Sequence, residues 1–148
     1  LIVRSASQDL EPDVVVGLLD TCLHVSHRAK RASSLLKSAA SDAMGQMILE
    51  VFSQPNLKRA REAILAKLAS LLNPNQNSDA YVVNSLTLVN IALETLTDDL
   101  TKKEIGILQN DMCKFLLGWS TTHDLVILSL TMRVIFNLFQ TIRNHLKV

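Results

Sequence analysis

The chain of 148 residues is poor in the residues that interrupt regular structure, with four glycines and three prolines. Few glycines and prolines mean few obligatory turns, so we expect long regular elements. Aromatic residues make up only 4% of the chain, which argues against a surface that stacks the bases of single-stranded nucleic acid. The net charge of +1 provides no overall field to attract nucleic acid or an anionic membrane.

Cysteines are equally scarce, and Cys22 and Cys113 each lie among apolar residues with helical spacing. We interpret them as reduced, buried thiols of a cytosolic protein, although a disulfide between them stays possible. No signal peptide is evident, and the longest apolar stretch, residues 125–132, is too short to span a bilayer. Because the chain opens on Leu1 rather than Met, we expect it to be a fragment of something longer.

Hydrophobic residues make up 48% of the chain, which is typical of one globular domain with a substantial core. Their spacing predicts six helices and no convincing strand. The predicted helices begin near residues 12, 33, 55, 79, 101 and 122, and the last of them continues to about residue 146. Thr101 and Glu104 form the pattern of a capping box. The last helix is apolar nearly all round from Leu125 to Phe139, so we expect neighbours on all its sides.

The helix starts recur along the chain. One set begins near residues 12, 56 and 101 and the other near 33, 79 and 123, so both step by about 45 residues, the spacing of HEAT and armadillo units. Ser41, Ser85 and Ser129 occupy the same place in three helices, where a small residue would allow close approach. The pattern predicts an all-α fold, an armadillo/HEAT-like right-handed α-solenoid of about three two-helix repeats. The alternative is an irregular helical bundle in which the repetition is coincidental.

Catalytic and metal-binding constellations are not found in the sequence. His24 and His27 have a helical spacing that suits a metal, but no third ligand is near and the adjoining residues are cationic. Cys113 has no histidine close in sequence, and the four glycines are isolated, so a phosphate-binding loop is not expected. The acidic pair Asp98 and Asp99 suits an exposed turn. We therefore expect no cofactor, no metal and no enzymatic activity.

Two basic stretches are the candidate binding features, His27–Arg31 and Leu57–Arg61. They could dock an acidic partner or anionic lipid headgroups. The alternative is that they are solvated helix ends, where cations suit the negative end of the helix dipole. The candidate partner- or membrane-binding residues are Arg28, Lys30, Arg31, Lys58, Arg59 and Arg61.

Three stretches resemble a known family: "LLNPNQNSD" (71–79), "NDMCKFLL" (110–117) and "MRVIFNLFQTIRNHLKV" (132–148). They are similar to the homology-upstream-of-Sec7 (HUS) domain of the large Arf guanine-nucleotide exchange factors, in the Golgi brefeldin A-resistance factor, Gea and GNOM branch. Residues 18–53 resemble the last helices of the preceding dimerisation and cyclophilin-binding (DCB) domain. The resemblance therefore divides the chain into a DCB-like part, 1–54, and the first helical repeats of a HUS-like part, 55–148.

The resemblance implies a non-catalytic scaffold within the regulatory region of such an exchange factor. It implies dimerisation, regulation of the Sec7 domain, small GTPases of Arf or Rab type as partners, and a location in the cytosol and at the peripheral Golgi membrane. Ser53-Gln54-Pro55 stands where the family usually has a long linker. The Asn-Tyr-Asp-Cys box and the Sec7 domain are absent from this sequence, so we expect no exchange activity.

An armadillo-like adaptor that binds peptides or other protein partners is the alternative function. Such a groove commonly uses a ladder of asparagine and tryptophan. Asn84, Asn90 and Asn137 are present, but Trp119 is the single tryptophan of the chain and lies at a helix end.

Overall fold

The computed structural model describes residues 12–28, 34–54, 56–75, 79–96 and 100–146. Within these ranges every regular element is helical, which confirms the predicted all-α class. The elements are α2 (Pro12–Arg28), α3 (Ser34–Ser53), α4 (Lys58–Leu71), α5 (Asp79–Thr95), α6 (Lys102–Gly106), the π-helical segment η1 (Ile107–Met112), α7 (Cys113–Trp119) and α8 (Leu125–Leu146). Each predicted helix start lies within a few residues of an observed one.

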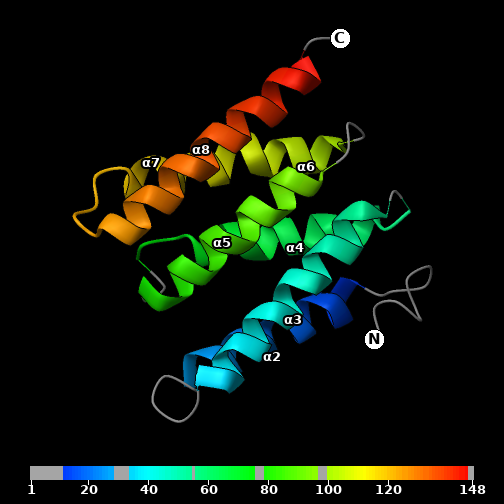
Figure 1. The fold of residues 1–148 in the computed structure, drawn as a ribbon. Helices are drawn as coiled ribbons and strands as arrows, with labels where there is room; N and C mark the ends of the chain where they lie inside the picture. The colour runs from blue at the N-terminus through cyan, green and yellow to red at the C-terminus, as the bar shows by residue number, and fades with distance from the viewer. Residues whose placement is uncertain (1–11, 29–33, 55, 76–78, 97–99, 147–148) are drawn as a thin grey trace.

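The helices form two rows (Figure 1). One row contains α2, α4 and the run from α6 to α7, and the other contains α3, α5 and α8. Each helix packs against its neighbours in the same row: α2 against α4, α4 against η1, α3 against α5, and α5 against α8. The two rows also contact each other: α2 packs against α3, α4 against α5, and α7 against α8. Helices α2 and α4 run in one direction, while α3, α5 and α8 run in the other (Figure 1).

A single core cluster runs between the two rows, from Val15 in α2 to Leu138 in α8. Leu, Ile, Val and Met dominate it, and their spacing of three and four residues places one stripe of each helix inside. Phe52 is the one buried phenylalanine of the described core. At Gly45, α3 and α5 come close, because a Cβ built there would lie 3.7 Å from Ile91 Cδ1.

The run from α6 to α7 begins with the capping box that the sequence predicts. Thr101 Oγ1 accepts a hydrogen bond from the Glu104 backbone N–H, and Glu104 Oε1 accepts one from the Thr101 backbone N–H, both over 3.1 Å. The predicted continuous α-helix is wrong in its middle, since η1 is π-helical. The Cys113 thiol donates to the Leu108 carbonyl, five residues earlier, at 3.1 Å.

The recurring serine position is buried in one of its three occurrences. Ser85 is buried in α5, where its hydroxyl donates to the Tyr81 carbonyl at 2.7 Å. Ser41 and Ser129 are exposed. The prediction that all three serines mark close helix contacts is therefore wrong for α3 and α8. These two helices lie at opposite ends of their row, so each has only one neighbouring helix in that row.

Candidate interaction surface

The prediction that α8 is covered on nearly all sides is wrong. Five large apolar side chains of this helix are 53 to 78% exposed: Leu125, Val126, Met132, Phe136 and Phe139. In the same row α5 lies between α3 and α8, and none of its described side chains is a large exposed hydrophobic. The difference arises because α8 has a neighbour in the row on one side alone. Exposed apolar side chains gathered on one element are typical of an interaction surface.

Two apolar stripes in the sequence of α8 account for this surface. The inner stripe includes Ile127, Val134 and Leu138, which are buried against the core. The outer stripe is Leu125, Leu128, Met132, Ile135 and Phe139, spaced by three and four residues in alternation. Leu128 and Ile135 are half-buried, and Ile135 also packs against the core cluster. The outer stripe is therefore accessible at Leu125, Met132 and Phe139, and Val126 and Phe136 are exposed beside it.

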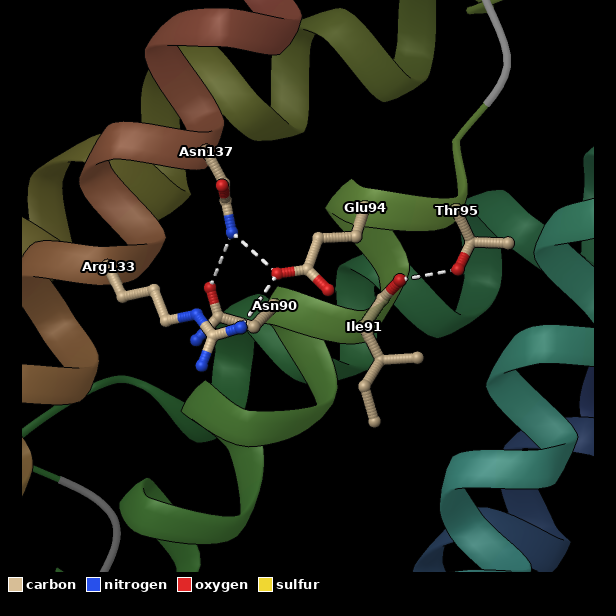
Figure 2. Close-up of polar contacts among 6 residues, drawn as sticks. All are labelled: Asn90, Ile91, Glu94, Thr95, Arg133 and Asn137. Carbon is tan, nitrogen blue, oxygen red and sulfur yellow. Dashed lines mark hydrogen bonds and ion pairs between the residues drawn. The ribbon is translucent and has the colours of Figure 1, made fainter.

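Polar contacts between α5 and α8 fix which stripe faces outward (Figure 2). Asn137 donates through Nδ2 to Asn90 Oδ1 at 3.0 Å and to Glu94 Oε1 at 3.3 Å. Arg133 Nη2 lies 3.1 Å from the same Glu94 oxygen. Asn90 is only 5% exposed, so its side chain has little access to water, and the hydrogen bond from Asn137 satisfies its buried amide oxygen. Rotating α8 about its axis would break these contacts, and the outer stripe is thereby held away from α5.

Helix α8 also has the length and composition of a membrane-crossing segment, from Leu125 to Asn144, and it is the one helix of the described residues that does. Residues 125–132, taken alone in the sequence, underestimate the length of this apolar segment. One such helix is weak evidence for a span, since core helices of soluble proteins have the same character. Its contacts with α5 argue for packing within the helical rows, because Asn137 and Arg133 both have partners there.

Arg61 is not part of any surface, so its assignment as a partner- or membrane-binding residue is wrong. Its Nη2 atom lies 3.0 Å from Glu104 Oε1, and both side chains are fully buried. The pair joins α4 to α6, which are neighbours in the same row. The same Glu104 oxygen also caps α6, so one carboxylate fixes the helix start and receives the buried guanidinium. The basic character of the Leu57–Arg61 stretch concealed this, because a sequence does not show which cation points inward.

The remaining basic candidates do not form one patch. Arg28, Lys58 and Arg59 are exposed, while Lys30 and Arg31 lie outside the described residues. Lys67 Nζ lies 3.2 Å from Asp20 Oδ1, which sets the register between the parallel helices α2 and α4. Arg28 is eight residues beyond Asp20, and Lys58 is nine residues before Lys67, so the two stretches are about 25 Å apart along the helix axes.

Two observations on the described residues concern groups that could take part in chemistry. They contain no group of three or more His, Cys, Asp and Glu side chains that could hold a metal. Cys22 and Cys113 are free thiols that are half-buried, and burial raises the pKa of each above its ordinary value. A raised pKa lowers the thiolate fraction at neutral pH, which is the opposite of what a nucleophilic cysteine requires. The predicted Asp98–Asp99 turn lies outside the described residues.

Further polar contacts between helices that lie far apart in the sequence could not be identified from the sequence. Trp119 donates its indole N–H to the Leu72 carbonyl at 2.6 Å, which ties the end of α7 to the end of α4. The partners are 47 residues apart, Arg61 and Glu104 are 43 apart, and Asn90 and Asn137 are 47 apart. These separations are close to the predicted period of about 45 residues. The signal that could have indicated them is the recurrence of polar residues at that period inside apolar stripes.

Comparison with known proteins finds a similarity to part of a guanine-nucleotide exchange factor homologue. Over 88 residues the chain is 33% identical to the Golgi-specific brefeldin A-resistance guanine nucleotide exchange factor 1 homolog of Caenorhabditis elegans. The match covers 57% of this chain and 4% of that protein, so the chain spans a small part of the relative's length. No family model matches the chain, and no solved structure matches it significantly.

Proposed function

We propose that the chain is a non-catalytic helical scaffold within the regulatory region of a large guanine-nucleotide exchange factor for Arf-type GTPases. The observation that carries this is the similarity to an exchange factor homologue at 33% identity. The helical architecture supports it, because the described residues form packed helices joined by buried contacts, and they contain no group of side chains that could hold a metal.

The architecture fits an armadillo/HEAT-like right-handed α-solenoid of three two-helix repeats. The pairs would be α2 with α3, α4 with α5, and the α6–α7 run with α8. Support comes from the two rows, in which each helix contacts its counterpart in the next pair. It also comes from the buried contacts that join residues 43 and 47 positions apart. In a solenoid each unit is stabilised by its neighbour, so such contacts belong between units.

We further propose that residues 1–54 are the end of a DCB-like region and residues 55–148 the start of a HUS-like region. Across the short junction, α2 packs on α4 and α3 packs on α5. The two parts share one core cluster, which runs through residues of both. A continuous core of this kind suits a rigid regulatory element better than two domains on a flexible linker.

The role of such an element would be to present surfaces for self-association, for contacts with the Sec7 domain and for small GTPases of Arf or Rab type. Its location would be the cytosol and the peripheral Golgi membrane, as the name of the relative suggests. The candidates for partner or membrane contacts are Arg28, Lys58 and Arg59, which are exposed, together with Lys30 and Arg31, which stay candidates from the sequence.

The alternative, an adaptor with a peptide-binding asparagine ladder, has less support. Asn90 and Asn137 hydrogen-bond to each other, and Asn90 is almost fully buried. A ladder residue must instead offer its amide to the backbone of an incoming peptide. Trp119 is likewise engaged, with its indole N–H on the Leu72 carbonyl.

Two assays on the 148-residue chain test the proposal. In the first, the chain is used to pull down a Sec7 domain and Arf and Rab GTPases loaded with GDP or with a GTP analogue, and we expect specific capture of at least one of these. In the second, release of labelled GDP from Arf is measured with and without the chain, and we expect no stimulation. Capture of none of them would remove the regulatory role, and stimulated release would show an exchange activity.

A charge-reversal variant tests the basic stretch. Replacing Arg28, Lys30 and Arg31 by glutamate should leave the helical circular dichroism intact and weaken binding to anionic vesicles or to the captured partner. The matched control reverses Lys58 and Arg59, about 25 Å away along the helix axes. If neither variant changes binding, both stretches are solvated helix ends.

A further inference from the structure

Two stretches of the chain have the same order of residues: a cation, two further residues, a serine and two leucines. They are residues 31–36, Arg-Ala-Ser-Ser-Leu-Leu, and residues 67–72, Lys-Leu-Ala-Ser-Leu-Leu. A cation three positions before a serine, with an apolar residue directly after it, is a charge pattern that basic-directed protein kinases recognise in their substrates. Ser34 and Ser70 are the serines of the two stretches, and no other serine or threonine of the sequence combines both features.

The fold closes the second stretch. Leu71 and Leu72 are 6% and 0% exposed, so both leucines after Ser70 are buried in the core. The cation of this stretch is engaged as well, because Lys67 Nζ lies 3.2 Å from Asp20 Oδ1. A kinase binds the residues around the acceptor serine in an extended conformation, and the second stretch reaches that conformation only if the core opens.

The first stretch is open where the structure describes it. Helix α3 begins at Ser34, and its first six residues are all exposed, so that the first buried side chain of the helix is that of Ala40. Leu35 is 79% exposed and Leu36 is 48% exposed, in contrast to the leucines of the second stretch. The first turn of α3 therefore buries little surface and can unwind into an active site while the core stays closed.

We propose that Ser34 is the acceptor of a protein kinase that recognises basic residues, and that its phosphate offsets the positive charge of the His27–Arg31 stretch. The recognised cation is Arg31, three residues before Ser34 in the sequence. In the reaction the Ser34 hydroxyl oxygen forms a bond to the γ-phosphorus of ATP while the bond from that phosphorus to the β-phosphate oxygen breaks. ADP leaves, and the hydroxyl proton passes to the catalytic carboxylate of the kinase. The inference rests on the proposed role of the basic stretch and adds its regulation.

A phosphate on Ser34 changes the charge of the chain and the start of α3. It adds a charge of about −2 at neutral pH, so the net charge falls from +1 to about −1. The added charge is close in sequence to Arg28, which is exposed at the end of α2, and to Lys30 and Arg31. The first turn of α3 contains no acidic residue, so a phosphate there interacts favourably with the positive end of the helix dipole. The modification therefore reduces the attraction of the basic stretch for acidic surfaces and stabilises the helix start.

Phosphorylation of the 148-residue chain tests the site. The chain is incubated with Mg²⁺, ATP and the catalytic subunit of cyclic-AMP-dependent protein kinase, and the modified residue is located by mass spectrometry. We expect one phosphate, on Ser34, and none on the Ser34→Ala chain. Arg31→Ala should lower the initial rate about tenfold or more, because the kinase loses its charge-assisted contacts to the guanidinium. Lys58→Ala, an equal loss of charge on α4, should leave the rate unchanged.

The second stretch provides a matched control for the fold. Lys67→Arg gives it the pattern of the first stretch, since an arginine then stands three positions before Ser70. A synthetic peptide of residues 64–74 with this change should be phosphorylated on Ser70. The folded chain with the same change should keep Ser70 unmodified, because the two leucines after it are buried. Circular dichroism checks that the substitutions leave the helix content of the chain unchanged.

Sedimentation with vesicles tests the effect on the basic stretch. The phosphorylated chain should bind phosphatidylcholine vesicles that contain phosphatidylserine about tenfold more weakly than the unmodified chain. Binding to vesicles of phosphatidylcholine alone should be the same for both forms. The Ser34→Ala chain, treated with the kinase in the same way, should bind as the unmodified chain does.

Several results would overturn the inference. They are no phosphate on the folded chain, a phosphate on Ser33 or Ser70 in place of Ser34, an Arg31→Ala rate equal to that of the unaltered chain, or equal binding to anionic vesicles with and without the phosphate. If no phosphate is found while a GTPase or the Sec7 domain is still captured, this inference falls and the proposed function stands. If Ser34 is phosphorylated but the chain captures no partner and binds no vesicles, the proposed function falls together with the regulatory effect, and the acceptor site is upheld.

Discussion

The buried pair between Arg61 and Glu104 gives the sharpest prediction for stability. Replacing Arg61 by Met removes the guanidinium and leaves the Glu104 carboxylate in a site where both side chains are fully buried. Removing one partner of a buried ion pair typically costs about 3–5 kcal/mol, because the other charge stays desolvated. A domain of ordinary stability has about 5–15 kcal/mol in total, so the loss is a large share.

Urea denaturation followed by circular dichroism at 222 nm measures this cost. For a urea m-value of about 2 kcal/mol per molar, a loss of about 3–5 kcal/mol lowers the midpoint by about 1.5–2.5 M. The m-value itself should not change, since the folded surface is the same. The control is Thr101→Ala, which removes one half of the capping box on α6 and keeps the ion pair, and it should cost about 1 kcal/mol.

A double-mutant cycle separates the ion pair from the rest of the site. Glu104→Gln keeps an amide oxygen that can cap α6 but removes the charge that faces Arg61. The double variant Arg61→Met with Glu104→Gln should be more stable than the two single losses added together, by about 1–3 kcal/mol. Strict additivity, or an Arg61→Met midpoint within about 0.5 M of the unaltered chain, would refute the reasoning that the pair holds α4 to α6.

Three further outcomes are expected. Asn137→Ala should lower stability by about 1–3 kcal/mol in the same assay, because Asn90 Oδ1 loses its donor in a buried site; an unchanged midpoint would contradict this. Gly17→Ala should raise stability by about 0.5–1 kcal/mol, since a Cβ there meets nothing within 4 Å and alanine favours the helix; a lower midpoint would show a contact not seen here. Because burial raises the folded-state pKa of Cys22 and Cys113, the stability they contribute is present below the unfolded-state pKa and is lost as the pH rises through the folded-state pKa. Alkylation by iodoacetamide at pH 8 should accordingly be slower in the folded chain than in urea, and equal rates would contradict the raised values.

The helical class, the helix starts and the capping box were predictable because they depend on local signals. Pro12 at a first turn and Thr101 with Glu104 at another act within a few residues, and the observed starts of α2 and α6 agree with them. The π-helical turn at η1 was not predictable in this way. The apolar residues Leu108 and Met112 are buried there, and their spacing of four fits an α-helix as well.

Which basic side chains are exposed depended on tertiary contacts. Arg59 and Arg61 stand two positions apart in one basic stretch, yet Arg59 is exposed and Arg61 is buried against Glu104. The sequence could not distinguish them, because the partner of Arg61 lies 43 residues away on another helix. The separation of Arg28 from Lys58 likewise follows from the parallel course of α2 and α4.

The sequence by itself determined that this protein is helical and that its helices recur about every 45 residues, because apolar spacing and helix caps act locally. It also contained both apolar stripes of α8. Only the tertiary structure decided which stripe enters the core: Ile127, Val134 and Leu138 are buried there, and in the same rotation of the helix Asn137 meets the buried Asn90 on α5. That choice leaves Phe136 and Phe139 facing outward.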